Sequence, residues 1–476
     1  MRYKICLFFF FALLIFGSVC SSAQELNERQ GVQFWLTTAD RSALFALQSG
    51  PLHFSDSAVE SKDAFPVVEV NDMEQYQSID GFGVALTGGS AQLLMHMDAV
   101  QRNSLLQELF GTGGNGIAIS YLRLTIGASD MNDHVFSYDD LPPGQTDVDM
   151  AKFNLGPDRA DVIPVMKEIL AINPRIKILG SPWSAPAWMK TNDDVKGGHL
   201  KPEFYGAFAN YFVKYIAGMK AEGIAIDTIT VENEPLNPKN TPSMVMFAPE
   251  QDVFVAKYLG PAFQKAGINT KILLYDHNPD VTSYPLSILA DSDASKYIDG
   301  TAFHLYGGDS SALTKVHDEY PNKNLYLTEQ SITQPPGDGP LDIAAAVARV
   351  LIGGTRNWSR NVLLWNLAAD PQAGPHANNG GCTMCWGVIT LDGNNVTRNV
   401  AYYALAHFSK FVPPGSLRVG SNELEQLSTV AFLTPEGKVV TIISNTGNFA
   451  KTFHVKYHGR SLTTTLPEES AGTYVW

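Results

Sequence analysis

Two glutamates follow apolar runs that have the length of buried strands. Glu234 comes shortly after residues 226–231, and Glu329 directly follows residues 324–328. Two facing carboxyl groups can cleave a glycosidic bond, because one protonates the leaving oxygen while the other attacks the anomeric carbon or activates water. A single Glu is more often a solvated surface residue or an ion-pair partner. A pair at two strand ends is therefore the observation that suggests glycoside hydrolysis.

A second glutamate close to Glu234 could fill the same catalytic role. Glu232 precedes Glu234 in the segment Glu232-Asn233-Glu234-Pro235. Both side chains would share one face if the strand stays regular, because strand side chains alternate with a period of two. Position alone does not choose between them.

Other strand ends supply groups that suit a sugar. Aromatic planes pack on the apolar face of a pyranose, and a few polar side chains bind its hydroxyls. Each such residue alone has a structural alternative, for example core packing or a barrel ion pair, but their joint placement predicts a binding site. The candidates are Arg123, Trp183, Trp188, His304, Tyr306 and Trp365.

The strands that must position these residues alternate with helical stretches. Eight βα units indicate an α/β fold, a (β/α)₈ TIM barrel, in which active residues stand at the carboxyl ends of the strands. Helices are predicted over 160–172 and from Pro202, where an aromatic stripe is interpreted as core packing. The predicted strands are 79–86, 117–124, 176–179, 226–231, 271–275, 299–304, 324–328 and 361–365.

Both ends of the chain have strand patterns instead. Val32, Phe34 and Leu36 recur at every second position, and short apolar runs return after residue 405. The two ends are predicted to pair into one side β-sandwich. The predicted organisation is a signal peptide (1–23), N-terminal strands of the side domain (24–75), the barrel (76–404) and the rest of the sandwich (405–476).

Composition excludes several classes of protein. The chain of 476 residues is 45% hydrophobic and 17% charged, which excludes intrinsic disorder. Its formal charge of −14 argues against a positively charged surface that would bind nucleic acid or anionic lipid. The glycine-rich segment 111–116 follows a helix and precedes a strand, the wrong order for a dinucleotide-binding loop, so it is interpreted as a turn.

The N-terminus has the order of a secretory signal peptide. Arg2 and Lys4 precede an apolar run of about 12 residues, too short to span a bilayer, and small residues lead to a predicted cleavage after Ala23. Lipid anchoring through Cys20 is the alternative. The sequence therefore predicts export, to the periplasm, the cell surface or the medium, without stable membrane insertion.

Export makes an oxidising compartment the expectation for Cys382 and Cys385. The pair is first interpreted as a local disulfide. A redox motif or half of a zinc site is the alternative, and neither a second Cys pair nor a nearby His pair accompanies it. We predict no metal and no cofactor.

At these motifs the chain resembles glycoside hydrolase family 30, which holds glucosylceramidases, β-1,6-glucanases and related enzymes. The resemblance covers nearly the whole predicted mature chain and implies the same barrel with a side β-sandwich. The segments that carry it are Gly81-Phe82-Gly83, Ser181-Pro182-Trp183, Trp188-Met189-Lys190-Thr191-Asn192, Glu232-Asn233-Glu234-Pro235, Trp365-Asn366-Leu367, His407-Phe408-Ser409-Lys410-Phe411, Gly415-Ser416 and Arg418-Val419-Gly420.

The resemblance implies a retaining double displacement. It assigns the acid/base to Glu234, the nucleophile to Glu329, and contact with the sugar 2-hydroxyl to Asn233. Arg123, Trp183, His304, Tyr306 and Trp365 match family positions around the reacting sugar.

Two departures favour the β-1,6-glucanase branch. Gly88 stands where the resemblance to glucosylceramidases implies an Asp that binds outer hydroxyls of a terminal glucose, so that contact is missing or supplied elsewhere. The segment Gly380–Val388 resembles the Gly-Gly-Cys-x-x-Cys-x-Gly segment of β-1,6-glucanases. A disulfide there would hold Trp386 at the mouth as a second sugar platform.

We therefore expect a secreted, retaining, endo-acting β-1,6-glucanase whose partner is a β-glucan or β-glucoside, with a monomer favoured. Glucosylceramidase or a small-glycoside β-glucosidase is the alternative within the family. A non-catalytic glycan-binding protein is the alternative of another class, and the presence of both carboxylates argues against it. A serine hydrolase has little support, because we find no Gly-x-Ser-x-Gly elbow.

Overall fold

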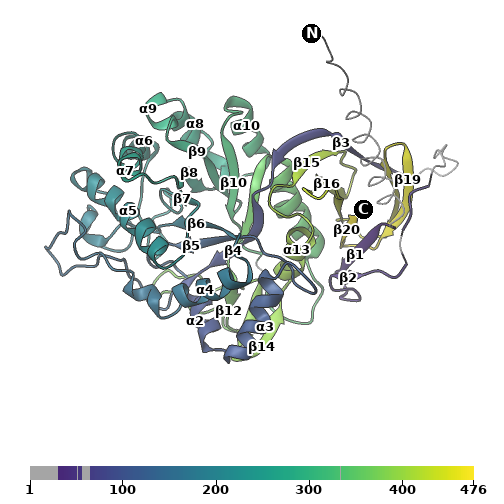
Figure 1. Ribbon diagram of the computed structural model, residues 1–476, viewed down its shortest axis with the longest axis horizontal. Coiled ribbons are helices and arrows are strands. Elements are labelled where there is room, and N and C mark those ends of the chain that lie inside the picture. The colour runs from purple at the N-terminus through teal and green to yellow at the C-terminus, as the bar shows by residue number, and fades with distance from the viewer. Residues whose placement is uncertain (1–30, 51, 56–64, 333) are drawn as a thin grey trace, which may run out of the picture.

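A computed structural model describes residues 31–50, 52–55, 65–332 and 334–476. The predicted signal peptide, Cys20 and the cleavage after Ala23 lie outside these residues. Figure 1 shows two parts side by side: a barrel ringed by helices, and a smaller β-domain where the first strands (purple) and the last strands (yellow) lie together. The predicted pairing of the two chain ends is confirmed.

The barrel is closed by eight parallel strands in the order β10-β11-β4-β5-β6-β7-β8-β9. Each is buried on both faces, as expected for strands covered by helices outside and side chains inside. All eight predicted strands are present. Their bounds are β4 Gly81–Leu86, β5 Tyr121–Thr125, β6 Lys177–Ser181, β7 Thr228–Thr230, β8 Lys271–His277, β9 Ile298–His304, β10 Asn324–Glu329 and β11 Ser359–Leu364.

Helices connect these strands and cover the barrel. The helix predicted from Pro202 is α5 (Tyr205–Ala221), which follows a short 3₁₀ turn; its aromatic stripe packs in the barrel core, as predicted. The others are α2 Gly88–His96, α3 Ala99–Phe110, α4 Val162–Ile172, α6 Ala248–Phe254, α7 Gly260–Ala266, α8 Ser283–Leu289, α9 Ser292–Ser295, α10 Ser311–Glu319, α11 Ile343–Ala346, α12 Gly353–Arg356 and α13 Val400–Ser409.

Two features between β11 and the side domain were not predicted. A small sheet of β12 (Ala368–Ala369), β13 (Ile389–Asp392) and β14 (Asn395–Arg398) follows the barrel. The predicted boundary between residues 404 and 405 falls inside α13, which is buried along its whole length. This helix joins both parts, because His407 bonds Thr473 at 2.8 Å and Thr37 at 2.9 Å.

The side domain is one hydrogen-bonded sheet of nine strands in the order β19-β18-β3-β15-β16-β17-β20-β1-β2. It folds over a core of its own, in which Phe453 of β18 meets Tyr474 of β20. The bounds are β1 Gln33–Thr38, β2 Ala46–Leu47, β3 Val67–Ser78, β15 Leu417–Ser421, β16 Leu427–Leu433, β17 Val439–Asn445, β18 Lys451–Tyr457, β19 Arg460–Leu466 and β20 Ser470–Val475.

The described part of the chain contains no helix whose length and hydropathy would let it cross a bilayer.

Candidate active site

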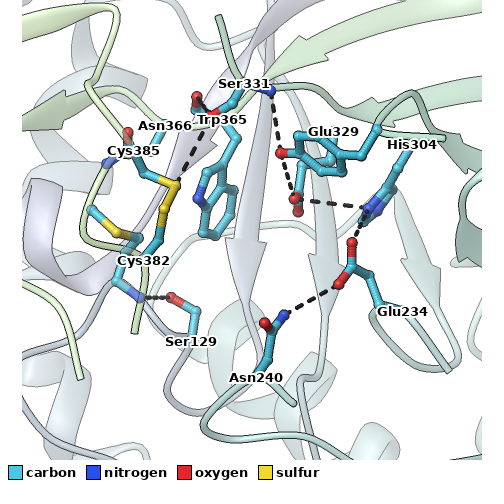
Figure 2. The surroundings of a disulfide bond; sticks show 12 residues. Ser129, Glu234, Asn240, His304, Glu329, Ser331, Trp365, Asn366, Cys382 and Cys385 are labelled. Carbon is cyan, nitrogen blue, oxygen red and sulfur yellow. Dashed lines mark hydrogen bonds and ion pairs between the residues drawn. A yellow bond between two sulfur atoms is a disulfide. The ribbon is translucent and has the colours of Figure 1, made fainter. Parts of the chain in front are cut away.

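The predicted site residues gather at the carboxyl ends of the barrel strands. Arg123 lies within β5, His304 and Glu329 end β9 and β10, and Trp365 directly follows β11. Trp183, Trp188, Asn233, Glu234 and Tyr306 follow β6, β7 and β9, whereas Trp386 lies beyond β12, just before β13. Figure 2 shows Glu234, His304 and Glu329 turned toward one another, with Trp365 between Glu329 and the disulfide.

The backbone separates Glu234 from Glu232. Strand β7 ends at Thr230, and Glu234 has a left-handed φ of 47°. The two side chains therefore do not share a strand face. Glu232 is fully buried and has no hydrogen-bond partner among the described residues. Burial raises its pKa well above the ordinary value, although the charge of Lys190 works against the rise. Glu234 faces the other acid.

Glu234 is held by one imidazole and two amides. Its Oε1 lies 3.1 Å from His304 Nδ1, and its Oε2 accepts hydrogen bonds from Asn237 at 2.7 Å and Asn240 at 3.2 Å. The side chain is nearly buried but reaches the mouth of the barrel. Asn237 and Asn240 were not singled out in the sequence, because they stand on a loop rather than at a strand end.

Glu329 is surrounded by groups that favour an anion. Its Oε2 ion-pairs with Arg123, and its Oε1 accepts a hydrogen bond from the Tyr306 hydroxyl at 2.9 Å. His304 Nδ1 lies 3.8 Å from the same Oε1. A carboxylate fixed by a guanidinium and a hydroxyl keeps one orientation, which a nucleophile requires.

The two carboxylates are close to each other. One oxygen of Glu234, one oxygen of Glu329 and one nitrogen of His304 lie within 4.8 Å of one another. Carboxyl groups about 5–5.5 Å apart are typical of retaining glycosidases, while inverting enzymes need about 6.5–9.5 Å to admit a water. The facing oxygens of the two acids thus leave less than 4.8 Å between them.

The same three groups have the donor types of a cation site. An imidazole binds a metal only through an unprotonated nitrogen. Burial disfavours the charged ring of His304, but the negative charges of Glu329 and Asp276 raise its pKa to about 10. The protonated ring offers no lone pair to a metal, and the Arg123 guanidinium already pairs with Glu329, so we assign no metal to these groups.

Asp276, just after the predicted strand 271–275, is a central residue that the sequence analysis missed. It accepts hydrogen bonds from Arg123 at 2.7 Å, Thr230 at 2.8 Å and Thr328 at 2.5 Å, and it lies 3.2 Å from His304 Nε2. Burial alone would raise its pKa, but the charges of Arg123 and His304 and the hydrogen bonds to the carboxylate together outweigh burial and lower it. A carboxylate at a strand end was the signal that could have found it.

The aromatic candidates form a wall beside Arg123. Its guanidinium carbon lies 4.7 Å from the Trp183 ring centroid and 5.8 Å from that of Trp365. Trp183 is only 1% exposed and Trp365 3%, so both mainly support the guanidinium. Tyr306 is 42% exposed. Trp188 donates a hydrogen bond to the Asp139 carbonyl and packs on Phe204, away from the acids.

Asn233 faces the same cluster. Its Oδ1 accepts a hydrogen bond from Arg123 Nη2 at 2.8 Å. Because the oxygen is held in this way, the amide nitrogen is the group that can donate to a sugar hydroxyl.

The acids of the free site differ in their affinity for a proton. Burial works to raise the pKa of Glu234, but the hydrogen bond and charge of His304 outweigh it and lower the pKa to about 2. Burial raises the pKa of Glu329, and His304 and Arg123 offset this only in part. An extra proton in the free site therefore favours Glu329.

The structure explains Gly88 and supplies another acid. A Cβ at Gly88 would lie 1.9 Å from Asn132 Nδ2, so a larger residue does not fit there. Asp130, two residues before Asn132, is buried, and its Oδ1 has no hydrogen-bond partner within the described part of the chain. Burial and the charges of Glu329 and Glu234 raise the pKa of Asp130 to about 8. A buried carboxyl group at position 130 thus lies near the two glutamates, while position 88 has none.

Cys382 and Cys385 form a disulfide in the structure, with Cα atoms 5.7 Å apart. Cys385 packs on Trp365, as Figure 2 shows, and its sulfur lies 4.0 Å from the Ser331 hydroxyl. Trp386 lines a separate hollow with residues of β13 and β14.

Comparison with known proteins agrees with this architecture. Residues 79–412 match the glycosyl hydrolase family 30 TIM-barrel domain, and residues 415–474 match the family 30 beta sandwich domain. The chain belongs to glycoside hydrolase family 30. It is therefore a glycoside hydrolase, and a serine hydrolase or a non-catalytic glycan-binding protein no longer competes.

Within family 30 the chain is similar to β-1,6-glucanases and to glucosylceramidases. It is 35% identical to endo-1,6-beta-D-glucanase BGN16.3 of Trichoderma harzianum, over 84% of each chain. It is 29% identical to the lysosomal acid glucosylceramidase of Mus musculus, over 85% of this chain and 82% of that one. The solved structure of the endo-beta1,6-glucanase BT3312 is 33% identical, with a TM-score of 0.85 over 94% of this chain and 99% of that one.

Proposed function

We propose that this protein is an exported, retaining, endo-acting β-1,6-glucanase. The observation that carries the retaining assignment is the close approach of Glu234 and Glu329, within 4.8 Å. The preference for β-1,6 linkages is supported by the higher identity to β-1,6-glucanases, 35% against 29% for the glucosylceramidase. Export is supported by the charge, apolar core and small-residue order of the first 23 residues.

In the proposed reaction Glu329 attacks the anomeric carbon and the bond to the leaving oxygen breaks. Glu234 gives its proton to that oxygen. Glu234 then takes a proton from water, and the resulting hydroxide releases the glycosyl group from Glu329. Arg123 and Tyr306 hold Glu329, and Asn233 donates from its amide nitrogen to the 2-hydroxyl.

This cycle requires a proton on Glu234, whereas the free site favours Glu329. A sugar over Glu329 brings partial positive charge to its anomeric carbon, which favours the ionised form of that acid. His304 Nδ1 lies 3.1 Å from Glu234 and 3.8 Å from Glu329. His304 can therefore give its proton to Glu234 and then take one from Glu329. Substrate binding would in this way protonate Glu234, the general acid, and leave Glu329 ionised.

The experiment is product analysis on linear β-1,6-glucan, with an aryl β-glucoside and glucosylceramide tested beside it. Early release of mixed oligosaccharides is expected for endo action. Proton NMR of the first product should show the β-anomer before mutarotation. A first product in the α configuration contradicts the retaining assignment, and an inert glucan contradicts the glucanase assignment.

Glucosylceramidase or a small-glycoside β-glucosidase remains the second candidate because of Asp130. This buried acid is close enough to Glu234 and Glu329 for their charges to raise its pKa. A terminal sugar hydroxyl could donate a hydrogen bond to Oδ1 of Asp130, which accepts none from the residues that the structure describes. Hydrolysis of glucosylceramide together with an inert glucan would favour this candidate.

A further inference from the structure

A hollow of about 350 Å³ lies beside the disulfide and is separate from the two acids. One side of it is a face of the β13–β14 hairpin. Thr390 pairs with Thr397 and Asp392 with Asn395 across the two antiparallel strands. Residues two apart on a strand point to the same face, so these four side chains present hydroxyl, amide and carboxylate groups together.

Apolar surfaces complete the hollow. Trp386 lines it, and Pro335 and Pro336 line it from the loop that follows β10. An aromatic plane beside several hydrogen-bonding groups is the equipment that binds a pyranose ring. The volume is within the range of small-molecule sites, about 300–1,000 Å³.

The segments that line the hollow are connected along the chain to residues that contact Trp365. Cys385 packs on Trp365, while its neighbour Trp386 lines the hollow. The loop with Pro335 begins after Ser331, whose hydroxyl bonds the Trp365 carbonyl at 3.2 Å. The two segments that line the hollow therefore each contact Trp365 through a nearby residue.

We propose that this hollow is a distal subsite for one further glucose unit of a β-glucan chain. The ring would pack on Trp386 while its hydroxyls bond Asp392, Asn395 and the two threonines. This proposal rests on the proposed function, since it names where the polymer continues. It explains why a disulfide fixes this segment: Cys385 supports the reacting site and Trp386 supports the next part of the substrate.

The side domain contacts the loop that carries Pro335 and Pro336. Arg41, which has a left-handed φ of 63°, donates a hydrogen bond from Nε to the Gly339 carbonyl at 2.9 Å and another from its guanidinium to the Gly337 carbonyl. The Leu341 amide donates to the Ala39 carbonyl at 2.8 Å. The turn after β1 thus clamps the loop that carries the two prolines, and Arg41 acts as a positioning residue for the subsite.

The test compares the full-length chain with Trp386→Ala on β-1,6-linked gluco-oligosaccharides of increasing length. A subsite that binds one ring predicts a loss of kcat/KM that grows with chain length and reaches about tenfold on the longest substrates, mostly through KM. Asp392→Ala should follow the same trend. Met384→Ala is the matched control, because Met384 is exposed in the same disulfide segment and does not line the hollow.

An equal loss on short and long substrates would show a structural role for Trp386 and overturn the proposal, as would an unchanged long-chain KM. Binding of the longest oligosaccharide to Glu329→Gln, with and without Trp386→Ala, gives a readout that needs no turnover. If the wild type cleaves no β-1,6 linkage, the proposed function fails, while this binding difference still decides the subsite: weaker binding supports it, and equal or absent binding contradicts it.

The substitution Arg41→Ala tests whether Arg41 positions the loop that carries Pro335 and Pro336. It should raise KM for long substrates and leave kcat nearly unchanged, because it acts through the loop. Arg175→Ala is its control, since Arg175 is exposed just before β6, at the opposite end of the barrel. A fall in kcat without a change in KM would contradict the positioning role.

Discussion

Arg123 donates a 2.7 Å hydrogen bond from Nη2 to Oδ2 of Asp276, and neither side chain is exposed to solvent. The same guanidinium ion-pairs with Glu329, and the other oxygen of Asp276 lies 3.2 Å from His304, the partner of Glu234. The Arg123–Asp276 pair therefore contacts the partners of both Glu234 and Glu329. A substitution of Arg123 or Asp276 is expected to affect both glutamates.

Asp276→Asn should lower both stability and activity. The substitution leaves Arg123 and His304 buried with one negative charge fewer, and breaking a buried ion pair costs about 3–5 kcal/mol of the free energy of unfolding. Urea unfolding at neutral pH measures this loss. Asp293→Asn is the control: its carboxylate pairs with Lys296 on the surface, so little change is expected. Similar losses in the two variants would contradict the role given to Asp276.

Azide should distinguish the two acids. With Glu234→Gln, an aryl glucoside whose leaving group needs no protonation still forms the glycosyl-enzyme, and azide attack on it gives the β-glucosyl azide. With Glu329→Gly, azide replaces the nucleophile and gives the α-glucosyl azide. Loss of the general acid alone costs about 10²–10⁴-fold on unactivated substrates. Glu232→Gln is the control and should form no azide product; the opposite anomers would reverse the assignment.

The pH dependence of stability should include a contribution from Asp130. Its pKa is raised from 3.8 to about 8, so between these values the folded state keeps a proton that the unfolded chain has lost. The free energy of unfolding then falls as pH rises through this range. His304 has the same sign: with its pKa raised to about 10, its contribution is complete below its ordinary 6.5 and disappears as pH rises through 10.

Asp130→Asn should therefore flatten the decrease of stability from about pH 5 to about pH 8 without abolishing it. The buried Glu232, whose pKa is also raised, contributes in the same direction and stays in place. Urea unfolding at several pH values gives the slope, and the exposed Asp293→Asn serves again as the control. An unchanged slope in Asp130→Asn would mean that Asp130 is ionised in the folded protein.

Much of the barrel could be predicted from the sequence because its strands are buried on both faces, which leaves continuous apolar runs. The residues directly after those runs, such as Glu329 and Trp365, could be predicted for the same reason. Strand β14 could not, because Asn395–Arg398 is short and exposed at alternate residues and gives no apolar signal.

The contacts among the site residues depend on distant parts of the chain. Asp276 matters because residues of β5, β7, β9 and β10 converge on it, and no local pattern records that convergence. The choice between Glu232 and Glu234 depended on where β7 ends and on one left-handed residue, which a period-two argument does not foresee. The clamp by Arg41 joins segments almost 300 residues apart.

Gly88→Ala should destabilise the protein through Asn132. The added Cβ would meet Nδ2 at 1.9 Å, while Asn132 is fixed by its Oδ1, which accepts hydrogen bonds from Ser129. Overpacking of this kind costs about 1–3 kcal/mol. The double variant Gly88→Ala/Asn132→Ala should lose less than the sum of the single losses, because removing Asn132 makes the space. Gly113→Ala is the control, since no atom of the described residues lies within 4 Å of a Cβ added there. Additive losses would show that the two positions do not compete.

Reduction of the Cys382–Cys385 disulfide should affect substrate use more than global stability. The bond closes a loop with a sequence separation of three, so in the chain-entropy model it contributes at most about 2 kcal/mol to the free energy of unfolding. The same segment, however, carries Trp386 beside the hollow. Dithiothreitol, or the double substitution of both cysteines by serine, should lower kcat/KM on long oligosaccharides more than on the disaccharide, while Tm changes little.

Thr383→Ala, an exposed change within the loop, controls for loss of a side chain alone. A large fall in Tm with an unchanged length dependence would instead assign the disulfide to the stability of the fold.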